Sequence, residues 1–203
     1  MALPRYTRRE RKPAREHLPK GAYVVKIVEA KIREWPSKDQ YIEIAYDIAE
    51  GEYAGFYNKQ YQEAKQNGEN AVWPYDARFN LNIPTDKSKD WEWNRYNEFF
   101  TQLEDSNDGF IFDGSNLTAL RKKLIGGKFR IKQSKGKNGT VYNNTQLWWT
   151  CNVEEVRSGK AAENLPKDSL VSDSGTGSTR ADSKDIDGFV NLPEGDDDEV
   201  PFV

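Results

Sequence analysis

The chain has 203 residues, with 30 Lys and Arg, 33 Asp and Glu, one His and one Cys. A single cysteine cannot build an internal disulfide framework, and a single histidine leaves too few residues for a Cys/His zinc site or a Ser-His-Asp triad. No apolar run reaches the length of a signal peptide or a membrane span. We therefore expect a protein of a reducing cytoplasm, with no metal, no other cofactor and no membrane partner.

The net charge and the aromatic content of the chain both change near residue 160. Residues 160–203 carry 4 Lys and Arg against 11 Asp and Glu, and hold 2 of the 25 aromatic residues. Such a segment cannot bury enough apolar surface to offset its ordering entropy, so we predict a disordered acidic tail over residues 160–203. The rest is net basic and long enough for one domain, which we place at residues 21–159. It follows a basic, proline-broken arm, residues 1–20, that could lie on phosphates or simply be solvated.

Alternation of apolar and polar residues predicts strands through the first half of the domain. Strands are expected over residues 22–33, 41–48, 56–62 and 77–83, with a turn at 35–39 and a long loop at 64–76. In the second strand Ile42, Ile44, Tyr46 and Ile48 would face inward, and Tyr41, Glu43 and Asp47 outward. In the third, Tyr57, Lys59 and Tyr61 would share one face.

The second half combines helices and strands. Helical spacing predicts helices over residues 91–104 and 115–125, the latter capped by Ser115 and ended by Gly126 and Gly127. Strands follow at 128–134 and 140–156, joined by a hairpin that contains Asn138-Gly139. Their inward residues would be Phe129, Ile131, Leu147, Trp149, Cys151 and Val153. The fold class is thus mainly β, a five-stranded OB-fold-like barrel with helices inserted between strands three and four.

Aromatic and cationic residues gather where such a barrel binds oligonucleotides. Aromatic rings stack on any base, and Lys and Arg follow the phosphates. An OB barrel binds through strands two and three and through loops one–two and four–five. For each aromatic taken singly, packing in or around the core is the alternative. The candidate DNA-binding residues are Trp35, Tyr41, Tyr57, Lys59, Tyr61, Trp73, Arg130, Lys132, Lys135, Lys137, Tyr142 and Trp148.

The tail ends in a run of carboxylates followed by an apolar tip. Asp196, Asp197, Asp198 and Glu199 would keep the segment in water and steer it toward a basic patch. Pro201 limits the unbound conformations, and Val200 and Phe202 offer an anchor for a pocket. An ordinary acidic terminus is the alternative. We predict that residues 196–202 dock onto protein partners.

Over residues 20–165 the chain resembles the single-stranded DNA-binding proteins of bacteriophages. The resemblance lies in the order and spacing of residues 21–25, 46–51, 55–57, 126–128 and 151–160. Separately, Val200-Pro201-Phe202 resembles the Ile-Pro-Phe tip of bacterial single-stranded DNA-binding proteins, which recruits replication and repair enzymes and competes with DNA for the binding groove. Val203 departs from that pattern, because partners there commonly grip a terminal phenylalanine with its carboxylate.

These features together predict a non-catalytic, sequence-nonspecific coat for single-stranded DNA in replication, recombination or repair. If the protein is encoded by a phage, it would act in the cytoplasm of the bacterial host. One alternative is a magnesium-dependent nuclease or resolvase using Glu104, Asp105, Asp108 and Asp113, although these residues also fit a polar helix end and turn. Another is a strand-annealing or RNA-binding protein. The tail's partner, and whether the protein is a monomer or a homo-oligomer, stay open.

Overall fold

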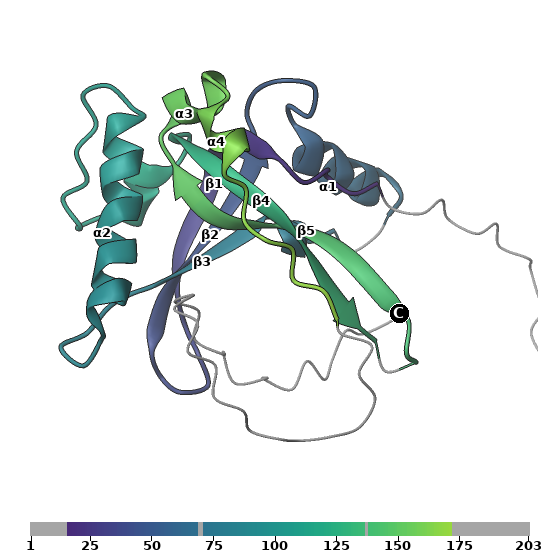
Figure 1. Ribbon diagram of the computed structural model, residues 1–203, viewed down its shortest axis with the longest axis horizontal. Helices are drawn as coiled ribbons and strands as arrows, with labels where there is room; N and C mark the ends of the chain where they lie inside the picture. The colour runs from purple at the N-terminus through teal and green to yellow at the C-terminus, as the bar shows by residue number, and fades with distance from the viewer. Residues whose placement is uncertain (1–15, 69–70, 137, 172–203) are drawn as a thin grey trace, which may run out of the picture.

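The computed structural model describes residues 16–68, 71–136 and 138–171. These residues form a five-stranded antiparallel sheet in the order β3-β2-β1-β4-β5 (Figure 1). Its strands are β1 (Ala22–Glu34), β2 (Gln40–Ile48), β3 (Arg78–Asn82), β4 (Leu124–Lys135) and β5 (Val141–Cys151). The mainly β class is confirmed. Within the described residues no ladder joins β3 to β5, so the sheet is not closed into a barrel.

Helices lie around the sheet rather than within it (Figure 1). They are α1 (Phe56–Gln66), α2 (Asp90–Asp105), α3 (Val153–Arg157) and α4 (Lys160–Glu163), with short 3-10 turns η1 (Tyr75–Ala77) and η2 (Leu117–Leu120). The helix predicted over residues 91–104 is confirmed as α2, which buries Phe99, Phe100 and Leu103. Among the described residues, no helix has the length and apolar character needed to cross a bilayer.

The predicted alternation of β2 is confirmed for its apolar residues. Ile42, Ile44, Tyr46 and Ile48 are all buried in the core. The prediction that Asp47 faces solvent is wrong, because its side chain is also buried. Its carboxylate accepts hydrogen bonds from the backbone N–H groups of Ile48 (2.9 Å) and Tyr57 (3.0 Å), and the second of these caps α1.

The strand predicted over residues 56–62 is wrong, because this segment is the start of α1. Gly55 precedes it with φ 76°, a left-handed conformation that glycine adopts without strain and that turns the chain into the helix. Tyr57 and Tyr61 are four residues apart and share a helical face, whereas Lys59 is exposed on another. The helix therefore hides Tyr57, which is only 2% exposed.

The helix predicted over residues 115–125 is reduced to η2, which Asn116 caps by accepting from the Thr118 N–H group. Gly126 and Gly127 do not end a helix but lie inside β4. A Cβ at Gly126 would lie 2.7 Å from the Cys151 sulfur, and one at Gly127 would lie 2.7 Å from Leu147. The two glycines are thus required by the close approach of β5 to β4.

Helix α2 lies where β3 and β5 fail to pair. The Arg95 guanidinium is 5.4 Å from the Phe79 ring of β3 and 5.2 Å from the Trp149 ring of β5. It also donates a long hydrogen bond of 3.5 Å to the Trp148 carbonyl. Burial lowers the pKa of Arg95. One half-buried cation between two aromatic rings therefore bridges the two outermost strands of the sheet.

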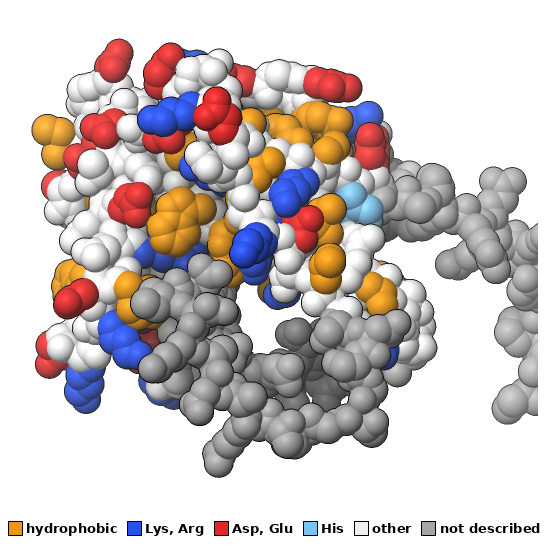
Figure 2. All heavy atoms as spheres, viewed as in Figure 1, with side chains coloured by type: hydrophobic (Ala, Val, Ile, Leu, Met, Phe, Trp, Pro, Cys, Tyr) orange, Lys and Arg blue, Asp and Glu red, His pale blue; other side chains and the backbone are white. Residues whose placement is uncertain are grey.

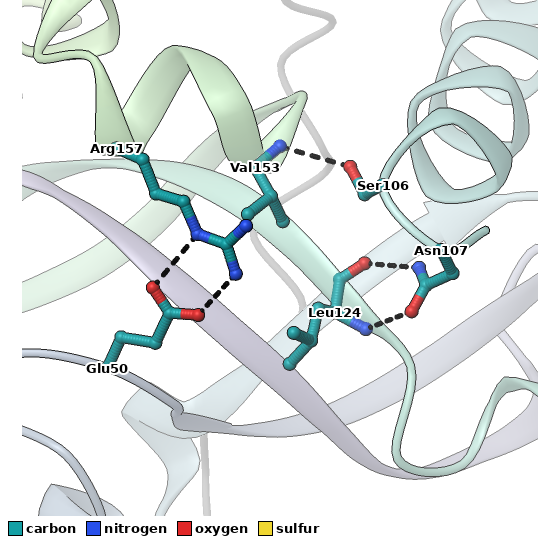
Figure 3. Close-up of polar contacts among 6 residues, drawn as sticks. All are labelled: Glu50, Ser106, Asn107, Leu124, Val153 and Arg157. Carbon is teal, nitrogen blue, oxygen red and sulfur yellow. Dashed lines mark hydrogen bonds and ion pairs between the residues drawn. The ribbon is translucent and has the colours of Figure 1, made fainter.

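Polar side chains brace the end of the molecule formed by α2, α3 and the start of β4 (Figure 3). The Asn107 amide donates to the Leu124 carbonyl (2.7 Å) and accepts from the Leu124 N–H group (2.9 Å). The Ser106 hydroxyl accepts from the Val153 N–H group, and Arg157 forms a two-pronged ion pair with Glu50. The Asn107 bonds hold the start of β4 against the end of α2, and the other two contacts hold α3 against the end of α2 and the segment after β2.

The boundaries of the arm and of the tail differ from the prediction. Most of residues 1–20 lie outside the described residues, but Leu18 is buried and its carbonyl accepts from the Thr145 hydroxyl. Residues 160–171, predicted as part of a disordered tail, are ordered: Ala161 of α4 is fully buried, and Ser169 pairs with β4. The apolar contact and the strand pairing explain why these residues join the domain.

Candidate nucleic-acid interface

Two aromatic rings stack at the turn that joins β1 to β2. The Trp35 and Tyr41 rings have centroids 4.1 Å apart and an interplanar angle of 25°. The Trp35 indole N–H donates to the Asn82 side-chain oxygen (3.1 Å), and Asn82 is paired with Tyr41 in the β2–β3 ladder. Contacts to β2 and β3 thus orient a half-buried aromatic stack on the face of the sheet opposite the core.

Charged groups next to this stack form an alternating row. The Glu43 carboxylate lies 3.5 Å from Arg33 of β1 and 3.2 Å from Arg78 of β3. Burial raises the pKa of the Tyr41 phenol, Glu43 and Tyr75 raise it further, and the two arginines lower it. The outer face of β1–β2–β3 therefore carries stacked aromatics beside two arginines that share one carboxylate.

The sequence did not single out several of these residues as candidates. Tyr75, in η1, is 79% exposed and is close enough to Tyr41 to affect its pKa. A signal for Tyr75 was present, since an aromatic in a polar loop has no core to fill. Asn82 and Arg33 could have been found only from the strand register, which sets both opposite Tyr41. Arg78 is opposite Ala45 and joins the site through its ion pair with Glu43.

The four candidates from α1 and the loop after it, Tyr57, Lys59, Tyr61 and Trp73, are not on the sheet and are not part of the Trp35–Tyr41 stack. Tyr57 is in the core, and Lys59 lies on the exposed side of α1. Tyr61 packs on Trp73, with ring centroids 5.6 Å apart, and the Trp73 indole donates to the Tyr46 carbonyl (3.2 Å). Trp73 thus acts as a packing residue that anchors the loop to β2.

The two tryptophans of β5 lie at a break in its pairing with β4. Lys128 pairs with Trp149 and Phe129 pairs with Leu147, so Trp148 is an extra residue at a β-bulge. Trp149 was predicted to be in the core, which is wrong: both tryptophans are half-buried. The Arg130 guanidinium lies over the Trp148 ring, and burial lowers the pKa of Arg130.

The β4–β5 hairpin carries the other basic candidates. Lys132 and Lys135 are exposed on β4, and Tyr142 is exposed on β5. Within the described part of the chain, neither lysine has a carboxylate within ion-pair distance. Figure 2 shows cationic and apolar side chains next to one another over β4, β5 and the segment that follows α4. Lys137 and the predicted docking residues 196–202 lie outside the described residues.

The aromatic stack and the hairpin are connected through η1. This turn packs against β5, and the Tyr46 hydroxyl of β2 donates to its Asp76 carbonyl (2.7 Å). Tyr75 thus belongs to a turn that contacts both β2 and β5.

The carboxylates considered for a nuclease have local structural partners. Glu104 accepts from the Phe112 N–H group (2.8 Å), and Asp113 accepts from the Ser115 N–H and hydroxyl groups. The residues that the structure describes contain no group of three His, Cys, Asp or Glu arranged to hold a metal ion. Burial raises the pKa of the Cys151 thiol to about 11, so it is not a nucleophile near neutral pH.

No protein-family model matches the chain, and no curated protein matches it either. The function is therefore inferred from the chemistry of these residues and from their arrangement on the sheet.

Proposed function

We propose that the chain binds single-stranded DNA without sequence preference and coats it by base stacking and phosphate contacts. The observation that carries the proposal is the Trp35–Tyr41 stack on the outer face of β1–β2, beside Arg33 and Arg78. A base can extend this stack, because stacking tolerates every base, and the arginines offer charge to the adjoining phosphates. No chemical step is part of this function, and the protein is not an enzyme.

The sheet supports an OB-type reading of the fold. In the order β3-β2-β1-β4-β5, β1 pairs with both β2 and β4, as in a five-stranded barrel opened between β3 and β5. OB barrels are partly open, and they bind oligonucleotides on strands two and three and on loops one–two and four–five. The aromatic stack lies at loop one–two, and the basic hairpin is loop four–five. Arg95 and α2 fill the open seam.

The acidic tail gives the proposal a second part. Its residues Asp196 to Phe202 recruit replication or recombination proteins, and its carboxylates compete with DNA for the basic surface at low salt. This role follows from the charge division of the sequence and from the resemblance of the tip to that of bacterial single-stranded DNA-binding proteins. A phage-encoded protein of this kind would work in the cytoplasm of the host.

Fluorescence anisotropy of a labelled dT oligonucleotide of about 30 nucleotides tests the DNA-binding proposal. We expect saturable binding, effective competition by unlabelled single strands and weak competition by matched duplex. The affinity should fall with salt by about 0.7 logarithmic units per logarithmic unit of salt for each phosphate contact. Lys132→Gln with Lys135→Gln should lower that slope, whereas the charge-matched control Lys65→Gln with Lys87→Gln should not.

Other outcomes would identify the alternatives. Preferential competition by RNA of the same sequence would point to an RNA-binding protein, because 2′-hydroxyl contacts distinguish the two polymers. Magnesium-dependent shortening of the labelled strand, lost in Asp108→Ala with Asp113→Ala, would point to a nuclease. Acceleration of pairing between complementary strands would add an annealing activity. Binding to none of these nucleic acids would contradict the proposal.

A further inference from the structure

A short segment after α4 pairs with an uncovered part of β4. Strand β1 pairs with β4 only over Leu124–Lys128, which leaves the same edge of β4 free further along. There the Ser169 N–H group donates to the Ile131 carbonyl (2.9 Å), and the Gln133 N–H group donates to the Ser169 carbonyl (2.7 Å). Figure 1 shows this segment running beside β4 toward the hairpin. The edge of β4 opposite β5 is thus occupied, beyond β1, by the chain itself.

The side chain of Asp168 lies at the beginning of this segment among hydrogen-bond donors. Its Oδ1 atom is 3.0 Å from Lys20 Nζ and 3.0 Å from the Ile131 backbone nitrogen. The Ile131 hydrogen bond lowers the pKa of Asp168 most, followed by Lys20 and, more weakly, by Arg130. One carboxylate therefore holds two donors and lies near a second cation.

Arg130 links this cluster to the aromatic candidates. Its guanidinium covers the Trp148 ring, and its Nε atom is buried with no hydrogen-bond acceptor among the described residues. A buried donor without a partner costs free energy that an arriving anion can recover. A backbone N–H group, a lysine and an arginine near an aromatic ring are the groups that bind a nucleic-acid phosphate.

We propose that Lys20, the Ile131 N–H group and Arg130 form a phosphate-binding subsite, in which the Asp168 carboxylate stands in for a phosphate of the bound strand. This proposal rests on the proposed function. A phosphodiester has two non-bridging oxygens that share one negative charge, as a carboxylate does, and it replaces the carboxylate on the same donors. Asp168 then leaves. The two hydrogen bonds between Ser169 and β4 are weakened, because Asp168 no longer holds the segment beside Ile131. The free edge of β4 becomes accessible when DNA is bound.

Three variants of the full chain test the subsite by dT anisotropy at low salt. Asp168→Asn keeps an acceptor for the Ile131 N–H group but removes the charge that competes with phosphate. We expect it to raise affinity about 3- to 10-fold. Lys20→Gln should lower affinity and reduce the salt slope by about 0.7. In the Lys20→Gln background, Asp168→Asn should give little further gain.

The matched control is Glu163→Gln, which removes one exposed carboxylate of α4 outside the subsite. Equal gains from Glu163→Gln and Asp168→Asn, or a gain from Asp168→Asn that persists without Lys20, would overturn the subsite while leaving single-strand binding intact. A wild-type chain that binds no single strand at all would instead contradict the proposed function.

Amide hydrogen exchange gives a readout that is independent of affinity. The Ser169 and Gln133 N–H groups hold the segment on β4, so saturating dT should speed their exchange. The Lys128 N–H group, in the β4 stretch that pairs with β1 and β5, serves as the internal control and should keep its protection. Unchanged or increased protection of Ser169 in saturated complexes would contradict displacement of the segment.

Discussion

The indole ring of Trp35 stacks on the phenol ring of Tyr41 with their centroids 4.1 Å apart, across the turn that joins β1 to β2. Under the proposed function, this pair is a preformed stacking surface for a base on the outer face of the sheet. A base bound there gains stacking without ordering the ring that receives it, since Asn82 already holds the indole N–H.

Replacing Trp35 with alanine should weaken single-strand binding. Loss of one stacked base costs about 1–3 kcal/mol, which corresponds to a roughly 5- to 150-fold rise in the dissociation constant. The control is Trp93→Ala, which removes an exposed tryptophan from a different element, α2. Anisotropy titration compares the two variants, and thermal unfolding checks that both remain folded. Equal losses of affinity would contradict a role for the stack.

Sequence periodicity predicted β2 well because one of its faces is buried along its whole length. The same rule failed over residues 56–62. There Tyr57, Lys59 and Tyr61 recur at every second position, as on one face of a strand, but the segment is a helix. There the spacing of Tyr57, Tyr61 and Ala64 carries the helical period, and the left-handed Gly55 starts the turn. Local pattern could not decide between the two periods without the neighbouring β2.

Long-range contacts explain the other differences. Gly126 and Gly127 look like a helix stop in the sequence. In the structure glycine is needed at both positions because Cys151 and Leu147 of β5 approach too closely for a side chain. The bulge at Trp148 shifts the face of each following residue of β5, which alternation cannot foresee. In the candidate site, the sequence found Trp35 and Tyr41, but the arginines beside them depend on strand register.

Asp47 should show opposite effects for two substitutions. Asp47→Ala leaves the Ile48 and Tyr57 N–H groups without an acceptor and should lower the free energy of unfolding by about 1–3 kcal/mol. Asp47→Asn keeps an acceptor oxygen and removes a buried charge, so stability near neutral pH should be equal or higher. Urea unfolding of both variants measures this difference.

The pH dependence of Asp47 follows from the direction of its shift. Burial raises the pKa of the Asp47 carboxyl, although its backbone hydrogen bonds lower it. The folded state then binds this proton more readily than the unfolded state. Its contribution to stability is therefore greatest below the unfolded pKa, falls as pH rises through the folded pKa, and stays low at neutral pH. Asp47→Asn should remove that fall, and an unchanged pH profile would contradict the raised pKa.

Arg95 should stabilise the open seam of the sheet. Arg95→Ala removes the side chain that contacts Phe79 and Trp149, and we expect a loss of about 1–3 kcal/mol in the free energy of unfolding. Arg121→Ala, at an exposed position after η2, should change stability by less than about 0.5 kcal/mol. A similar small effect at Arg95 would mean that α2 does not hold the seam through this residue.

Deleting residues 172–203 should raise single-strand affinity at low salt, and the difference from the full chain should vanish as salt rises. This result is expected because the deletion removes carboxylates that compete with phosphates. Phe202→Ala should leave DNA affinity unchanged but abolish binding of the tail to a replication or recombination protein. An unchanged low-salt affinity after deletion would contradict competition by the tail, without bearing on the stack.

The proposed function requires that aromatic side chains of this chain stack on the bases of single-stranded DNA. Intrinsic tryptophan fluorescence, recorded during titration with a dT oligonucleotide and with matched duplex at low and high salt, tests it most directly. We predict quenching by the single strand, reduced by salt and diminished in Trp35→Ala, with little response to duplex. No change in fluorescence with either nucleic acid at low salt would contradict the claim.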